Sequence, residues 1–86
     1  MQQGSIDNFN YSIIEDGTRS TDTGVVLPLY TVELTNTDLD QTVLIKQMVC
    51  FLPHTNYVLN TWNTVVSVLN GEPHCCFAGK VFWLKK

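Results

Sequence analysis

Alternation of apolar and polar residues is most regular in residues 25–52, where two apolar runs flank a short polar segment. In the first run Tyr30, Val32 and Leu34 alternate with polar residues. Every second side chain of a strand lies on the same face, so this run predicts a half-buried β-strand that starts at Leu29. The second run is apolar on both parities, which is typical of a strand with a packing layer on each side.

Turn chemistry separates the two runs. Residues 36–40 read Asn-Thr-Asp-Leu-Asp, and Asn and Asp side chains tolerate turn geometry and bond their own main chain. The two strands are therefore expected to form a hairpin or a corner between sheets.

The remaining apolar runs are shorter and predict further strands. Residues 9–14 form one candidate, which turn residues at 15–17 are expected to end. Residues 75–84 form another candidate, after a tight turn expected at Asn70-Gly71. Residues 62–69 contain several valines, whose branched side chains disfavour a helix, and residues 57–63 are expected to be a loop or a short strand. Residues 1–8 are polar and expected to be flexible.

These patterns predict one all-β domain over residues 1–86. The expected architecture is a small antiparallel β-sandwich or a partly open barrel of five to six strands. A hydrophobic share of 44% with only 15% charged residues supports a folded chain rather than a disordered one. The net charge of −3 has the wrong sign for a nucleic-acid partner. No long apolar segment or signal peptide is visible, so no membrane contact is expected.

The three cysteines, Cys50, Cys75 and Cys76, allow one disulfide with a free thiol, or three free thiols. Adjacent strand residues point to opposite faces, so only one of Cys75 and Cys76 can face Cys50. If the protein is secreted, we expect one disulfide from Cys50 to Cys75 or Cys76. His54 and His74 lie near these cysteines, but the spacing fits a zinc site poorly and a cysteine in an apolar run is ordinarily core. We expect no metal, no cofactor and no enzymatic activity.

One segment has the composition of a binding surface, because aromatic rings and amides suit both sugars and peptides. The binding candidates are Tyr57, Asn60, Trp62 and Trp83. The competing interpretation is that Trp62 fills the core. Residues 10–12 read Asn-Tyr-Ser, so Asn10 is a candidate glycosylation site in the secretory route.

The order of several short motifs resembles the tapetum determinant family of small secreted plant proteins. The motifs that carry this resemblance are Gln3-Gly4, the strand positions Pro28, Tyr30, Val32, Glu33, Leu34 and Asn36, the pair Ile45 and Cys50, the step Leu59-Asn60 before Trp62, the turn Gly71-Glu72-Pro73, and the closing Val81-Phe82-Trp83. The cysteine pattern differs, since Cys75-Cys76 has no counterpart in the family. The resemblance implies an extracellular signalling or recognition domain that acts through a leucine-rich-repeat receptor kinase.

Three functions are therefore expected, in this order. The first is a non-enzymatic extracellular recognition domain that binds a protein receptor. The second is a carbohydrate-binding β-sandwich module that stacks a glycan on Tyr57, Trp62 or Trp83. The third is a self-assembling structural subunit of a filament or capsid, because low charge and apolar strands at exposed edges favour pairing between strands.

Overall fold

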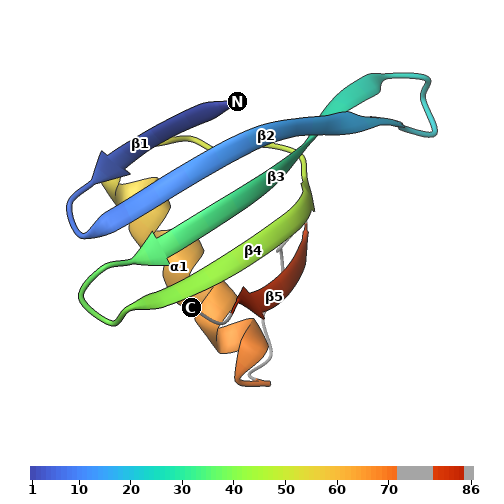
Figure 1. Ribbon diagram of the computed structural model, residues 1–86. Helices are drawn as coiled ribbons and strands as arrows, with labels where there is room; N and C mark the ends of the chain where they lie inside the picture. Colours follow the sequence, from blue (N-terminus) through green and yellow to red (C-terminus); the bar gives the residue numbers. More distant parts are fainter. Residues whose placement is uncertain (72–78, 85–86) are drawn as a thin grey trace.

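The fold is one antiparallel sheet with a single helix packed on one face (Figure 1). The computed structural model describes residues 1–71 and 79–84. Its elements are β1 (Gln2–Ile6), β2 (Phe9–Ser20), β3 (Val26–Asn36), β4 (Gln41–Met48), α1 (Thr55–Leu69) and β5 (Lys80–Leu84). The strands lie side by side in the order β1-β2-β3-β4-β5, and every neighbouring pair is antiparallel.

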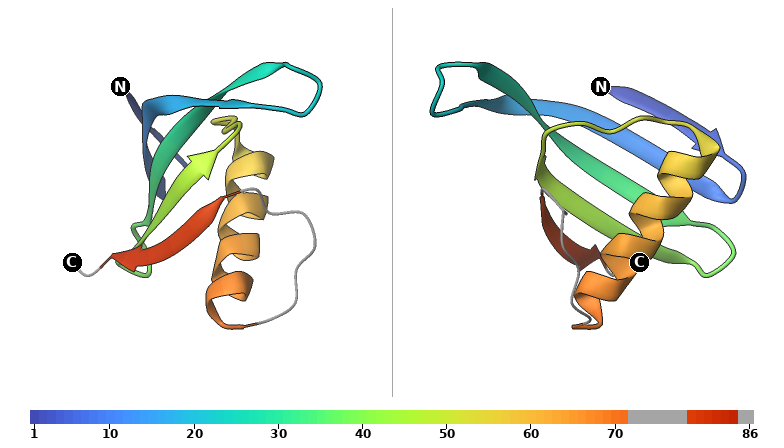
Figure 2. Two further views of the ribbon diagram at one scale, coloured as in Figure 1. Left: turned by 90° about the vertical axis from the view of Figure 1, so that its right-hand side faces the viewer. Right: turned by 180° about the vertical axis from the view of Figure 1, so that it is seen from behind.

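The predicted antiparallel β fold of five strands is confirmed, but the sheet is open and neither a sandwich nor a barrel is formed by the described residues. The second layer is α1, which crosses one face of the sheet, and no other described helix or strand covers the opposite face (Figure 2). The two faces of the same strands therefore have different surroundings.

The predicted hairpin over residues 25–52 is confirmed as β3 and β4, which pair with Leu34 opposite Val43. Asn36 holds the turn between them. Its side-chain oxygen accepts hydrogen bonds from the backbone nitrogens of Asp38 and Leu39, both at 3.1 Å, and from the side chain of Asn8 at 3.2 Å. This one buried amide ties the β3–β4 turn to the neighbouring β1–β2 turn.

β2 and β3 are longer than the sequence predicts. The expected turn at residues 15–17 is a bulge inside β2, where the register shifts and Gly17 has φ +91°. Beyond the bulge the two strands continue as an arm that projects from the sheet (Figure 1). β3 starts at Val26 rather than Leu29, and Pro28 lies within this arm, opposite Thr18.

The N-terminal segment, which the sequence predicts to be flexible, forms the edge strand β1. It pairs with β2 from Gln2 opposite Ile13 to Ile6 opposite Phe9. The Tyr11 ring lies over Gly4, where an added Cβ would be 2.6 Å from the ring atom Cζ. A larger residue at this position would force the Tyr11 ring to move, because the ring occupies the space that a side chain would need.

The strand predicted at residues 62–69 is wrong, and so is the loop or short strand at 57–63, because residues 55–69 form α1. Val58, Trp62 and Val65 recur at helical spacing and are buried against the sheet. The intrinsic preference of valine for strands is small compared with the free energy of burying such a face.

Both ends of α1 are capped without charged residues. The His54 ring atom Nδ1 accepts a hydrogen bond from the backbone nitrogen of Tyr57 at 3.2 Å and so acts as the N-cap. At the other end the predicted Asn70-Gly71 turn terminates the helix, with Gly71 at φ +80°. The helix is thus held over the sheet by local hydrogen bonds as well as by packing.

The core lies entirely between α1 and the sheet. Its buried residues are Phe9, Ile13, Val32, Leu34, Val43, Ile45, Met48, Phe51, Val58, Trp62 and Val65. β4 contributes Val43, Ile45 and Met48 to this core, because an irregularity in the β3–β4 register before Met48 brings this residue to the same side as the other two. The sequence predicts a packing layer on each side of this strand, but among the described residues only α1 packs on it, on one side.

Candidate functional site: the open face of the sheet

The uncovered side of the sheet, called the open face here, consists of rows of side chains that run across all five strands. The first row is Ser5, Asn10, Thr35, Thr42 and Leu84. The second row is Gln3, Ser12, Glu33, Leu44 and Phe82. In both rows the residues on β1 to β3 are polar, and the residue on β5 is apolar.

The polar half of the open face contains a shallow hollow of about 410 Å³. Its lining residues are Gln3, Gly4, Ser5, Asn10, Tyr11, Ser12, Glu33 and Thr35. Hydrogen bonds between neighbouring strands order part of this surface. The Ser5 hydroxyl donates to the Asn10 side-chain oxygen at 2.7 Å, and the hydroxyls of Thr35 and Thr42 are 3.0 Å apart.

Among the described residues that line this hollow, Glu33 alone is charged. Its side chain is exposed, and within the described residues it forms no hydrogen bond or ion pair. The hollow therefore offers one carboxylate among hydroxyls and amides, which suits a neutral or cationic polar ligand rather than an anion.

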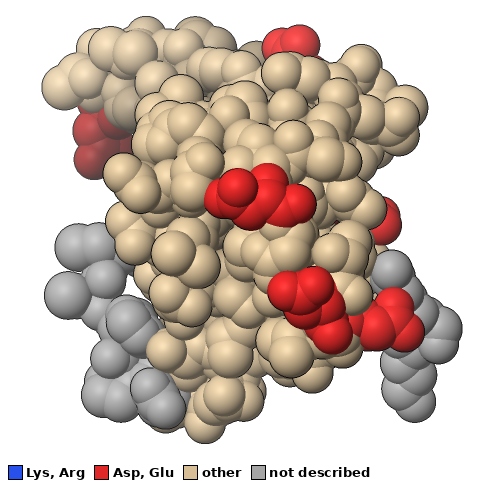
Figure 3. All heavy atoms as spheres, turned by 90° about the vertical axis from the view of Figure 1, so that its left-hand side faces the viewer, with Lys and Arg blue, Asp and Glu red and all other residues tan. Residues whose placement is uncertain are grey.

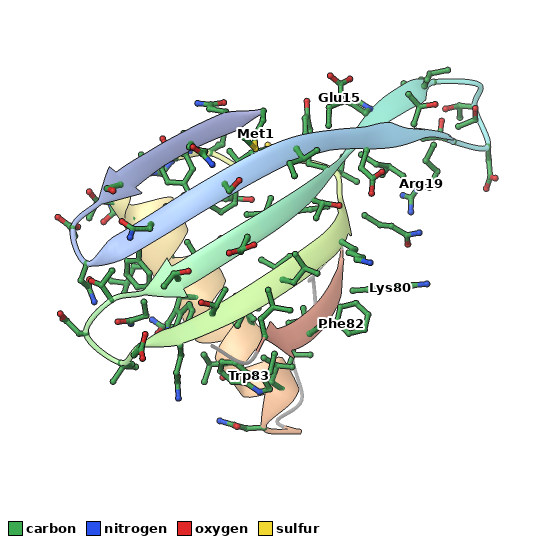
Figure 4. The ribbon with its side chains drawn as sticks, in the orientation of Figure 1. Met1, Glu15, Arg19, Lys80, Phe82 and Trp83 are labelled. Atoms are coloured by element: carbon green, nitrogen blue, oxygen red, sulfur yellow. The ribbon has the colours of Figure 1, made fainter. Side chains whose placement is uncertain are left out.

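The apolar half of the open face is formed by Leu44, Phe82 and Leu84 on β4 and β5. The Phe82 side chain is 46% exposed, and Figure 4 shows it beside Lys80 on β5. The Lys46 ammonium lies 5.9 Å from the centre of the Phe82 ring, and Lys46 is paired directly with Lys80. This half is thus an uncovered apolar surface with two lysines at one end.

The predicted binding residues do not lie on the open face. Trp62 is 5% exposed and packs on Phe9 and Trp83, with ring centres 5.5 Å and 6.4 Å away. The competing interpretation, that Trp62 fills the core, is confirmed. Trp83 is 41% exposed and lies on the helix side of β5, so the structure brings the two tryptophans together on the side of the sheet opposite the open face.

Tyr57 and Asn60 lie on α1. Tyr57 is half-buried, packs edge-on against Phe51 and donates from its hydroxyl to the Cys50 carbonyl oxygen at 3.1 Å. Burial raises the pKa of the Tyr57 hydroxyl and the nearby Cys50 raises it further, while a hydrogen bond with Thr61 lowers it. Asn60 is exposed. Tyr57 therefore acts in packing and in anchoring the segment before the helix.

Cys50 is a free, exposed thiol in the connection between β4 and α1, so the expectation that it sits in an apolar strand is wrong. Gln47 adopts φ +60° near the end of β4, and residues 49–52 leave the sheet. Cys75, Cys76 and His74 lie outside the described residues, and the disulfide stays a prediction. His54 is used as a helix cap, and no group of three or more metal-ligating side chains gathers within residues 1–71 and 79–84.

Asn10, the candidate glycosylation site, lies within the hollow and accepts the hydrogen bond from Ser5. A glycan on Asn10 would cover the polar half of the open face. Glycosylation and a contact at this hollow are therefore mutually exclusive uses of the same surface.

The open face was not among the sequence-predicted sites, although half of its signal is present in the sequence. Alternation along β3 identifies Glu33 and Thr35 as outward residues. Their neighbours Ser12 and Asn10 become neighbours only through the strand register. A site assembled from single residues on several strands cannot be located without that register.

No family model, curated protein or solved structure matches this chain. In the part of the chain that the structure describes, no helix has both the length and the apolar character needed to cross a membrane.

Proposed function

We propose that this chain is a non-enzymatic structural subunit that assembles with copies of itself through the open face. The observation that carries the proposal is the one-sided cover of β4. α1 covers the side of β4 that carries Val43 and Ile45, whereas Leu44, together with Phe82 and Leu84 of β5, lies on the side that no described element covers. Apolar surface of this kind is stabilised when a second surface excludes water from it.

The distribution of charge supports the same function. Residues 47–71 contain no Asp, Glu, Lys or Arg, and this stretch includes the whole of α1. Leu59 and Val68 are nevertheless 47% and 38% exposed. Depletion of charged residues together with exposed apolar side chains is typical of the central part of protein interfaces.

A second copy packed on the apolar half would also provide the missing layer. The sandwich predicted from the sequence would then form between two chains rather than within one. Leu44 and its apolar neighbours on the open face would be buried at the contact. Lys46 and Lys80 would lie at the rim of this contact, where long side chains can keep their charges in water.

Replacement of Phe82 by serine tests the proposal. Because Phe82 is 46% exposed, Phe82→Ser should leave the fold intact and weaken assembly about tenfold or more, which corresponds to roughly 1.5–3 kcal/mol for a side chain buried at an interface. Sedimentation velocity over a concentration series measures the effect, with circular dichroism to verify folding.

The matched control is Ile14→Ser, which removes a side chain that is 45% exposed on the same face but outside the apolar half. This variant should assemble as the unmodified protein does. A monomer at every soluble concentration, or equal effects of the two substitutions, would refute the proposal.

A second candidate is carbohydrate binding, favoured by the polar hollow around Glu33. Hydroxyls, amides and one carboxylate can bond sugar hydroxyls, although the exposed aromatic ring usual in such sites is not among the lining side chains on this face. A glycan array tests this candidate. Binding that Glu33→Gln removes would support it, and absence of binding to any glycan would exclude it.

The extracellular recognition function implied by the tapetum determinant resemblance is a separate proposal that rests on sequence motifs. It predicts saturable binding to the ectodomain of a leucine-rich-repeat receptor kinase. It also predicts one disulfide and one free thiol in protein isolated without reductant. Three alkylated cysteines by intact mass would contradict the disulfide and weaken the extracellular assignment.

A further inference from the structure

β1 is the outermost strand of the sheet on the side opposite β5, and its outer edge has no partner strand among the described residues. We propose that β1 pairs antiparallel with β1 of a second copy, about a two-fold axis at Gly4, so that two sheets join into one. This inference rests on the proposed self-assembly and names a second contact for it.

The hydrogen bonds of the β1–β2 hairpin define which backbone groups of β1 point outward. The Asn8 carbonyl accepts from the Thr37 nitrogen at 2.9 Å, so Asn8 directs its peptide group toward the β3 side. Backbone N–H and C=O groups alternate in direction from one residue to the next, so those of Tyr11 point toward β1. Gly4, which is paired with Tyr11, therefore points its own N–H and C=O groups toward β2. Gln3 and Ser5 therefore present their N–H and C=O groups at the free edge.

A two-fold axis at Gly4 places the outward backbone groups of Gln3 and Ser5 opposite those of the second copy. Gln3 of one chain then lies opposite Ser5 of the second copy, and the reciprocal pair completes four backbone hydrogen bonds. On the open face the Gln3 amide meets the Ser5 hydroxyl of the second copy. At the axis the two Gly4 residues form a non-hydrogen-bonded pair, whose Cα atoms lie closer together than those of a hydrogen-bonded pair. Glycine has no side chain to obstruct this close approach.

Nothing in β1 opposes such pairing. The five residues Gln2–Ile6 contain no proline and no charged side chain, although exposed edges are commonly protected by these residues. β5, at the other end of the sheet, carries Lys80. The two edge strands therefore differ in charge, a feature that keeps an exposed edge from pairing with another chain.

Electrostatics favours the antiparallel arrangement. Among the described residues, the side of the molecule that faces the viewer in Figure 3 shows carboxylates and no lysine or arginine. The β1–β2 and β3–β4 turns, which carry Asp7 and Asp38, lie at that end of the sheet (Figure 1). Arg19 and Lys80 lie toward the opposite end (Figure 4). Antiparallel pairing places the two acidic ends on opposite sides of the axis and so avoids repulsion between them.

The expected dimer is weak by itself. Five paired residues on each chain are far fewer than the roughly 20–30 residues on each side of a standard interface. Combined with the contact through the apolar half of the open face, however, the edge contact gives each subunit two different attachment points. An extended assembly needs at least two such contacts, and each raises the effective concentration for the other.

The test uses cysteines placed on β1 in a variant whose three native cysteines are serine. With the axis at Gly4, the double variant Gln3→Cys with Ser5→Cys should form a covalent dimer upon oxidation or with a short thiol cross-linker, because opposed residues lie about 5.5 Å apart. The single variants Gln3→Cys and Ser5→Cys are the controls and should cross-link at least tenfold more slowly. Ser5→Lys should weaken the dimer in sedimentation velocity, because lysines protect edges.

The outcomes separate this inference from the proposed function. Equal cross-linking of the single and double variants overturns the pairing at Gly4, and so does an unchanged dimer in Ser5→Lys. If assembly still responds to Phe82→Ser, the proposed function stands without this contact. If cross-linking is specific but Phe82→Ser has no effect, the edge contact stands and the open-face contact fails.

Discussion

The two faces of the sheet are built from the same strands but differ in almost every physical property. On the covered face Val32, Leu34, Val43 and Ile45 have no exposed surface. Their sequence neighbours lie on the open face, which contains the exposed carboxylate of Glu33, a hollow of polar side chains and an apolar half. Stability therefore comes from the side chains that pack against α1, whereas the side chains on the open face are available for contacts with partners.

The largest difference between the faces is expected from removal of apolar side chains. Leu34→Ala should lower the free energy of unfolding by about 2–5 kcal/mol, because Leu34 is fully buried and the change leaves a cavity. Ile14→Ala, on the open face with a side chain that is 45% exposed, should cost less than about 1 kcal/mol. Urea denaturation measures both values, and similar losses would show that the open face is also part of the stabilising core.

A smaller effect is expected at the sheet edge, where the two faces can be probed at adjacent residues. Gly4→Val should destabilise the protein by about 1–3 kcal/mol, because the new side chain collides with the Tyr11 ring. Ser5→Val places the same side chain on the open face, where the residue is exposed, and should be close to neutral. Thermal unfolding of both variants gives the comparison, and equal losses would contradict the placement of Tyr11 over Gly4.

The smallest effect concerns the connection that brings α1 onto the covered face. Tyr57→Phe removes the hydrogen bond to the Cys50 carbonyl and should cost about 0.5–1.5 kcal/mol near neutral pH. The raised pKa of the Tyr57 hydroxyl in the folded protein adds a pH dependence. The stability that the protonated Tyr57 hydroxyl contributes is fully present below the unfolded-state pKa of about 10. It is lost as the pH rises from that value through the higher pKa of the folded protein, because the unfolded chain releases the proton first.

The measurement is the urea midpoint of both proteins from neutral to alkaline pH. The unmodified protein should lose stability above about pH 10 more steeply than Tyr57→Phe does. Parallel curves would show that this hydroxyl titrates alike in the folded and unfolded states.

Much of the sheet could be predicted from the sequence, and the helix could not. The period-two pattern of Tyr30, Val32 and Leu34 is strong enough to locate β3, and the Asn and Asp residues locate its turn to β4. In α1, β-branched residues hid the helical spacing of Val58, Trp62 and Val65. The histidine cap and the absence of acidic residues in the first turn removed the usual start signals, and the Asn70-Gly71 stop signal reads equally well as a turn between strands.

The candidate site was less predictable than the fold. Aromatic and amide residues near Trp62 have the composition of a binding surface, but that tryptophan is buried under the helix. Composition does not distinguish a ring that binds a ligand from a ring that fills a core. The open face consists of ordinary serines, threonines and amides whose importance comes only from being side by side on neighbouring strands.

The sequence by itself determined that this chain forms antiparallel strands, where the central hairpin turns, and that β4 is apolar on both parities. These are local properties, because they depend on the alternation of side chains and on turn residues. The tertiary structure alone decided that residues 55–69 form a helix, which face of the sheet it covers, and that β1 is the outermost strand on one side of the sheet. Those outcomes depend on which distant segments bury apolar surface together, a free-energy balance that no single stretch of sequence contains.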